Sequence, residues 1–164
     1  MTIQIDTREH DDAVKNIKQY FTDNGILFFD SKLFVGDYMS LDNARFCIDR
    51  KQSLLEIAQN VCQDHERFSR ELERAKQYGI RLVFLIEHGA DIRTLNDVKK
   101  WKNPRLKTSK LAVSGERLYK ILSTLEKTYD TKFYFCTKEQ TARGIIKLLK
   151  MNGGEGSACL TADL

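Results

Sequence analysis

The fold is decided by the stretch GDYMSLDNARFCIDRK, which spans residues 36–51. Residues 36–41 and 45–51 are typical of β-strands, and residues 42–44 between them are typical of a hairpin turn. A three-residue turn pairs Leu41 with Arg45, and the same register places Asp37 directly across from Asp49. Directly opposed side chains have Cβ atoms about 4.5–5.5 Å apart. The stretch therefore predicts a hairpin that holds two carboxylates together, whereas a two-residue turn would direct Asp49 to the other face.

Two carboxylates at this separation repel each other unless one is protonated or a cation lies between them. A hard divalent ion that prefers oxygen ligands, such as Mg²⁺, would relieve the repulsion. Side chains alternate across a strand, so Cys47, Asp49 and Lys51 share one face and an ammonium lies beside the expected metal. A metal-activated water and a nearby lysine are what phosphodiester hydrolysis requires.

The remaining pattern alternates between strands and helices. Strands are expected at residues 3–7, 26–30, 82–86 and 133–136, the third of them buried on both faces. Helices are expected at residues 11–24, from Ser53 to near Gly79 in two stretches, and at 118–129. Residues 137–140 match a capping box that opens a last helix. The pattern predicts an α/β fold in which a central mixed sheet is flanked by helices.

Length and composition limit the alternatives. The 164 residues suit one domain, expected to span residues 1–151, while residues 152–164 have little apolar content and are expected to form a flexible tail. A net charge of +4 is too small to identify a nucleic-acid partner by itself. Widely spaced cysteines, a start without a signal-like apolar stretch and the lack of long apolar runs predict a cytoplasmic protein that does not enter membranes.

The hairpin motifs have a companion near the N-terminus, so that three motifs follow in order: Asp6-Thr-Arg8-Glu9, then Gly36-Asp37-Tyr38, then Asp49-Arg50-Lys51. Together they resemble the XPF-family nuclease domain, whose signature is a DxRE-like start, then GD, then ERK. The resemblance covers about the first 90 residues well. It implies a restriction-endonuclease-like fold and divalent-metal-dependent cleavage of DNA, often at branched, flapped or junction structures.

The resemblance also implies roles for individual residues. Asp37 and Asp49 would bind Mg²⁺ or Mn²⁺ and take part in catalysis with Lys51, the catalytic lysine. Asp6 would be a further metal ligand, and Arg8 and Glu9 would complete the catalytic site. The chain would be a free-standing nuclease domain of the bacterial or phage type, without the helix-hairpin-helix modules that often follow this domain.

Two departures from the family pattern affect the site. Asp49 stands where the family usually has Glu, which shortens the reach to a metal by one methylene. The family has an acid four residues after the lysine, but Leu55 occupies that position and the nearest acid is Glu56. Ser53 to Glu56 matches a capping box, which gives Glu56 a structural alternative to a place in the site.

Two basic regions are candidates for binding DNA. Arg67, Arg70 and Arg74 would share one helical face, although interleaved glutamates make a salt-bridged solvent face equally plausible. Residues 99–110 contain six basic residues and no acidic ones, and could close over DNA as a flexible lid. In the competing interpretation this segment is a solvated loop whose tryptophan lies in the core. The candidate contacts in it are Lys100, Trp101, Lys102, Arg105 and Lys107.

Three alternatives remain beside the endonuclease. A non-catalytic DNA-binding or scaffold domain is the first, although Asp37, Asp49 and Lys51 together speak against it. A small-molecule-binding protein is the second, but neither GxGxxG nor a Walker lysine loop is found. A homodimer formed through the late amphipathic helices is a further hypothesis, while Leu118, Ile121, Leu122 and Leu125 are more simply explained as core residues.

Overall fold

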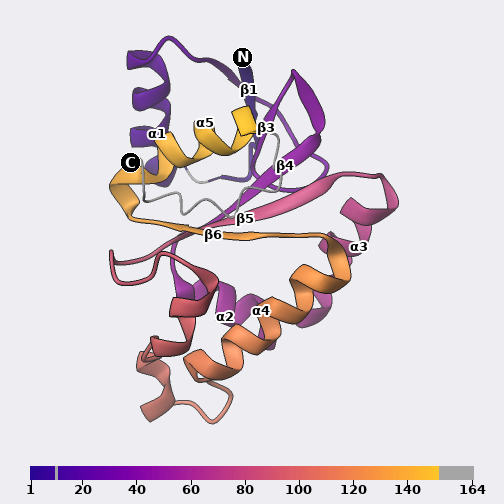
Figure 1. Ribbon diagram of the computed structural model, residues 1–164. Coiled ribbons are helices and arrows are strands. Elements are labelled where there is room, and N and C mark those ends of the chain that lie inside the picture. The colour runs from indigo at the N-terminus through magenta and orange to yellow at the C-terminus, as the bar shows by residue number, and fades with distance from the viewer. Residues whose placement is uncertain (10, 152–164) are drawn as a thin grey trace.

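The computed structural model describes residues 1–9 and 11–151. The predicted tail at residues 152–164 lies outside the described residues. Within them, six strands form one mixed sheet in the order β2-β1-β3-β4-β5-β6 (Figure 1). The strands are β1 (Thr2–Ile5), β2 (Leu27–Asp30), β3 (Tyr38–Ser40), β4 (Asn43–Lys51), β5 (Arg81–Glu87) and β6 (Phe133–Cys136). Only β3 runs antiparallel to its neighbours β1 and β4, which confirms the predicted mixed sheet.

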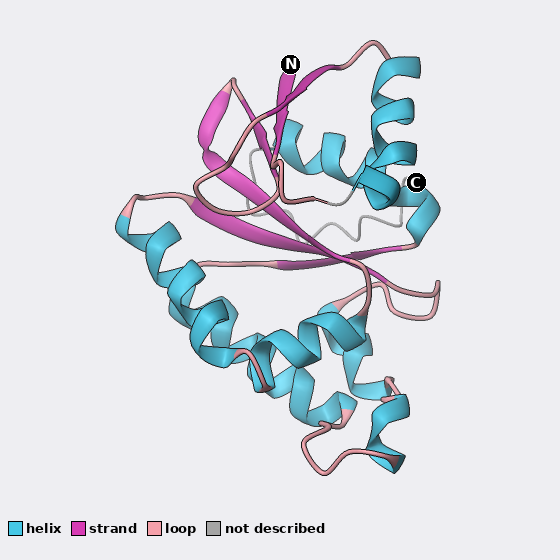
Figure 2. Cartoon of the chain, turned by 180° about the vertical axis from the view of Figure 1, so that it is seen from behind, coloured by secondary structure: helices cyan, strands magenta, loops and turns pink. Residues whose placement is uncertain are grey.

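Helices cover both faces of this sheet. On one face lie α1 (Asp11–Asp23) and α5 (Thr141–Met151), and on the other lie α2 (Leu54–Cys62), α3 (His65–Gln77) and α4 (Gly115–Tyr129) (Figures 1 and 2). Alternate residues of β5 divide between the two cores: Val83 and Leu85 face α1 and α5, whereas Leu82, Phe84 and Ile86 face the other three helices. This confirms that the strand is buried on both faces.

The register of the β3–β4 hairpin is as predicted near the acids but not at the turn. Tyr38 pairs with Ile48 and Met39 with Cys47, and the same register places Asp37 across from Asp49. Ser40, however, pairs with Asn43, so the expected pair of Leu41 with Arg45 is wrong. From the pair Met39–Cys47 to the pair Ser40–Asn43, β3 moves by one residue and β4 by four, so β4 contains an irregularity. The turn is shorter than predicted, and the extra residues of β4 compensate for it, so Asp37 still lies across from Asp49.

The basic segment is ordered around a buried tryptophan. It contains two 3₁₀ helices, η1 (Leu95–Lys100) and η2 (Pro104–Lys107), instead of the expected flexible lid. Trp101 between them is only 9% exposed and packs in the core beneath α4. The prediction that Trp101 stacks on DNA is therefore wrong, because its ring is needed to bury the segment. Lys100, Lys102 and Lys107 remain exposed.

The late helices also serve the core. Leu118 and Leu122 of α4 are fully buried, and Ile121 and Leu125 pack against the same cluster. These residues therefore give the homodimer no support, and the dimer itself stays a prediction. The capping box of Thr137 and Gln140 is present and leads into α5, as predicted. No helix among the described residues is long and apolar enough to cross a membrane.

Replacing Trp101 by alanine tests its core role. We expect a loss of about 3–5 kcal/mol in the free energy of unfolding, because a large buried ring is replaced by a cavity. Urea denaturation followed by circular dichroism measures this loss. The exposed Leu111, directly after the same segment, supplies the control, and Leu111→Ala should change stability by less than about 0.5 kcal/mol. Equal effects of the two substitutions would contradict the assignment.

Candidate active site

Asp37 and Asp49 are brought together at the end of the hairpin. Gly36 turns the chain into β3 with a φ of +69°, a conformation in which a Cβ would also lie 3.0 Å from the Ile48 carbonyl oxygen. The Asp37 N–H donates to that carbonyl at 2.8 Å. The Asp37 carboxylate in turn accepts from the backbone N–H of Arg50 at 2.7 Å. The backbone of β4 thus fixes both the main chain and the side chain of Asp37.

Asp49 has an unusual environment for a charged group. It is 3% exposed, and its Oδ1 has no hydrogen-bond partner of good geometry among the described residues. Lys51 Nζ lies 2.5 Å from this oxygen as an ion pair. The buried oxygen therefore relies on a charge contact with Lys51, and the carboxylate remains a candidate ligand for a cation. Lys51 itself is held on the same face, with its ammonium 6.0 Å from the ring centroid of Phe84.

The surroundings of Asp37 and Asp49 oppose the ionisation of their carboxyl groups. Burial, and then the charges of Asp49 and Glu9, raise the pKa of Asp37 well above its ordinary value. Burial also raises the pKa of Asp49 to about 6, although Lys51 opposes the change. Burial alone would lower the pKa of Lys51, but Asp49 and Asp37 outweigh it and raise that pKa. Lys51 therefore keeps its positive charge, whereas the raised pKa values of Asp37 and Asp49 disfavour their ionised forms.

These donors suit a hard divalent ion. Carboxylate oxygens are the ligands that Mg²⁺ and Mn²⁺ prefer, and a cation between Asp37 and Asp49 would satisfy the Asp49 oxygen and relieve the repulsion. Within the described part of the chain, no group of three or more acidic, histidine or cysteine side chains is placed to hold a metal. The chain therefore offers a pair of carboxylates, which leaves further positions for water or phosphate oxygens.

Asp6, predicted as a third metal ligand, is engaged in other contacts. Its two buried oxygens accept four hydrogen bonds at 2.7–2.8 Å, three from Arg8 and one from the Leu33 N–H. These bonds hold the Arg8 guanidinium at the end of β1 and tie down the loop that leads to Asp37. The contacts give Asp6 the task of positioning Arg8, and Asp37 and Asp49 remain the candidate pair of metal ligands.

Glu9 joins a buried network that the sequence did not reveal. Arg50 points to the opposite face of β4 from Lys51, where its Nη1 lies 3.3 Å from Glu9 and its Nε donates to Glu87 at 2.7 Å. The Thr141 hydroxyl donates to the same Glu87 oxygen at 2.7 Å. Burial raises the pKa of Glu9, although Arg50 opposes the change. An arginine at an inward position and a glutamate ending an apolar strand were the available signals for this network.

A cleft of about 240 Å³ opens beside Lys51. Arg67 and Arg74 of α3 line it together with Arg8, whereas Arg70 does not, so two of the three predicted arginines reach the site. Glu71 lies between them and was missed by the sequence analysis. Its Oε1 accepts from the Gly36 N–H at 3.2 Å, which fastens the Asp37 loop to α3. The cleft is therefore lined by basic side chains together with the acidic Asp64 and Glu71.

Glu56 has a structural role at the start of α2. Its backbone N–H donates to the Ser53 hydroxyl at 3.1 Å, and its carboxylate accepts from the Gln52 N–H at 2.7 Å. The predicted capping is present, with the returning bond made to Gln52 instead of Ser53. These bonds give Glu56 a capping role, while its charge also acts on Asp49 and Lys51.

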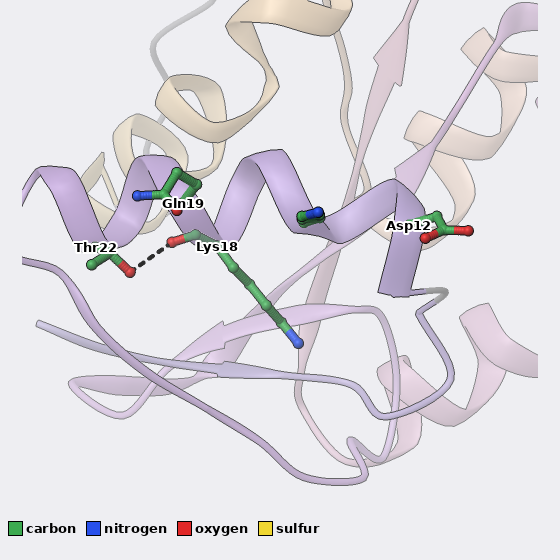
Figure 3. Close-up of a pocket in the computed structure, with 5 residues that line it drawn as sticks. Asp12, Lys18, Gln19 and Thr22 are labelled. Atoms are coloured by element: carbon green, nitrogen blue, oxygen red, sulfur yellow. Dashed lines mark hydrogen bonds between the residues drawn. The ribbon is translucent and has the colours of Figure 1, made fainter.

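Another hollow lies along the exposed side of α1, on the other face of the sheet (Figure 3). Its lining comes from one helix, and two of its polar groups are engaged elsewhere: the Thr22 hydroxyl donates to the Lys18 carbonyl and the Lys18 ammonium to Asp30. It brings together no set of side chains suited to catalysis.

The geometry agrees with comparisons to known proteins. The sequence matches the ERCC4 domain over residues 5–149. The structure is similar to XPF from Aeropyrum pernix, with a TM-score of 0.65, 18% identity and coverage of 94% of this chain and 66% of that one. It is also similar to the same XPF in complex with DNA, with a TM-score of 0.64, 18% identity and coverage of 93% and 64%. No curated protein sequence matches this chain significantly.

Substituting Asp37 by asparagine should stabilise the metal-free protein at pH 7.5. An unfolded aspartate ionises near pH 4, and the folded pKa is raised, so stability falls as the pH rises from about 4 toward the folded pKa. The substituted amide would carry no charge, yet its oxygen could still accept from the Arg50 N–H. We expect the melting temperature to rise by about 2–5 °C at pH 7.5 and to change little at pH 4.

Differential scanning calorimetry in EDTA measures both values. The matched control is Asp42→Asn in the exposed turn of the same hairpin, which should change the melting temperature little at either pH. A loss of stability at pH 7.5, or the same gain at both pH values, would refute the repulsion between the carboxylates.

Proposed function

Since the chain belongs to the ERCC4 domain family of XPF-type nucleases, we propose that it is a DNA endonuclease that hydrolyses phosphodiester bonds with Mg²⁺ or Mn²⁺. The observation that carries the proposal is the register that places Asp37 across from the buried Asp49, with Lys51 Nζ 2.5 Å from Asp49 Oδ1. The metal, when bound, would lower the pKa of a water and offset charge on the phosphate. Asp37 and Asp49 would hold it.

The side chains around this pair have separate tasks. Lys51 supplies a fixed positive charge on the same face as Asp49, where it can orient the attacking water or neutralise the phosphate in the transition state. Arg8, anchored by Asp6, reaches into the cleft with a half-exposed guanidinium and would steady the scissile phosphate. Glu9 lies beside Arg50, and its charge contributes to the environment of Asp37.

DNA is the substrate we propose. The XPF structure in complex with DNA has the same fold, and the basic cleft here lies beside the carboxylate pair. Branched, flapped or junction DNA is the substrate class that the family resemblance implies. The buried free thiols of Cys47 and Cys136 suit a reducing intracellular compartment.

The first experiment combines substrate, metal and site. Labelled duplex, single-stranded, flapped and four-way-junction DNA is incubated with the protein in Mg²⁺, Mn²⁺ or EDTA. We expect metal-dependent cleavage that falls at least about 100-fold in Asp49→Ala and in Lys51→Ala, because each removes charge stabilisation from the transition state. Asp42→Asn should retain wild-type rates.

A binding measurement accompanies the activity. Mn²⁺ should raise the melting temperature of the wild type and of Lys51→Ala, but not that of Asp49→Ala, because only the last variant loses a ligand. Circular dichroism verifies that each variant is folded. DNA binding without cutting under every metal would replace this proposal with a non-catalytic DNA-binding domain.

We propose that the basic segment adds non-specific DNA affinity. Replacing Lys100, Lys102, Arg105 and Lys107 by alanine should weaken binding to all sequences alike. The slope of log affinity against log salt should become less steep by roughly 0.7–0.9 per lost phosphate contact. Fluorescence anisotropy at several KCl concentrations between about 50 and 200 mM measures the slope. An unchanged slope would remove this segment from the interface.

A further inference from the structure

Two exposed aromatic rings lie at the rim of the catalytic cleft. Phe34 is 50% exposed and Tyr78 is 59% exposed, and their centroids are 4.6 Å apart in an edge-to-face arrangement. Phe34 precedes Asp37 by three residues in the loop between β2 and β3, and Tyr78 is the C-cap of α3. The pair therefore joins the segment that carries a catalytic carboxylate to the helix that lines the cleft.

Arg74 connects this pair to the cleft. Its guanidinium carbon lies 5.6 Å from the Phe34 ring centroid, and its Nη1 donates to the Phe34 carbonyl at 3.4 Å. The same side chain lines the cleft beside Lys51. An arginine held between an aromatic ring and a basic cleft can contact a phosphate, and the Phe34 ring on which it lies is still half exposed and so partly accessible to a base.

The helix extends this arrangement into a continuous stripe. At about 100° per residue, Arg67, Glu71, Arg74 and Tyr78 fall within an arc of about 60° on α3. The first three line the cleft, so the last lies on the same side of the helix. The stripe runs from cationic groups at the cleft to aromatic rings at its edge, over about 16 Å. Alternating cations and exposed rings are how proteins follow a single strand, with phosphates on the cations and bases on the rings.

We propose that Phe34 and Tyr78 form a stacking platform for an unpaired base of the DNA strand that enters the cleft. This inference rests on the proposed function, because it assigns to the same site a preference for DNA with an unpaired segment beside the scissile phosphate. Paired bases of a continuous duplex are already stacked on one another and offer no free face to the rings. The platform therefore distinguishes flapped or single-stranded DNA from a fully paired duplex.

Matched substitutions separate stacking from mere apolar contact. Tyr78→Leu and Phe34→Leu keep an apolar side chain but remove the ring, whereas Tyr78→Phe keeps the ring. Leu27→Ala removes a side chain that is 69% exposed at the distant end of β2 and serves as the surface control. Binding is measured in EDTA, so that no variant cuts its substrate, with a flapped DNA and with a fully paired duplex of the same length.

We expect Tyr78→Leu and Phe34→Leu to bind the flapped DNA at least about five-fold more weakly and the duplex within about two-fold of the wild type. Tyr78→Phe and Leu27→Ala should match the wild type on both. A 2-aminopurine in the unpaired strand should lose fluorescence on binding wild type and Tyr78→Phe, but less on binding either leucine variant. Equal weakening on flap and duplex, or no weakening on the flap, would overturn the platform.

The outcomes also keep the two proposals apart. If the leucine substitutions weaken flap binding while the wild type shows no metal-dependent cleavage, the endonuclease is refuted and the platform is supported. A wild type that cuts with Mg²⁺ while its leucine variants bind the flap normally supports the endonuclease and refutes the platform.

Discussion

The opposition of Asp37 and Asp49 across the β3–β4 hairpin is the constraint on which the rest of the site depends. A buried pair of carboxylates is costly, and the folded chain tolerates it because several backbone bonds leave Asp37 no other position. Lys51 compensates part of the charge and does so from the side on which the cleft opens. The Asp49 oxygen that contacts Lys51 is buried, so the two carboxylates and the ammonium form one cluster of charges.

Arg50 shows how the hairpin serves both faces of the sheet. Its backbone N–H fixes the Asp37 carboxylate, while its side chain crosses to the opposite core and is held by Glu87 and Glu9. The strand that carries Asp49 and Lys51 is therefore anchored from behind by a buried ion pair. Breaking such a pair leaves an uncompensated buried charge, so the position of β4 is strongly determined.

The sequence predicted those parts of the fold that depend on local pattern. Short apolar runs located β5 and β6, the strand pattern beside a turn located β4, and the register from Asp37 to Asp49 followed from pairing rules even though the turn was misplaced. The prediction of the turn was wrong because the strand irregularity between Asn43 and Cys47 has no signature in the amino-acid composition. Trp101 could not be assigned from its basic neighbours, since its burial depends on a helix that follows later in the chain. Glu71 and the ring pair of Phe34 with Tyr78 become visible only when α3 packs against the Asp37 loop.

The hydrogen bond that Thr141 donates to Glu87 bears on the order in which parts of the chain fold. Residues that shape the site are drawn from position 6 to position 141, so the hairpin can form early in synthesis while the anchor behind it is completed only when α5 docks. Contacts between such distant segments form late because the entropy of closing a long loop opposes them. A nascent chain on the ribosome, or a proteolytic fragment without α5, would contain Asp37, Asp49 and Lys51 but lack the contacts that anchor β4.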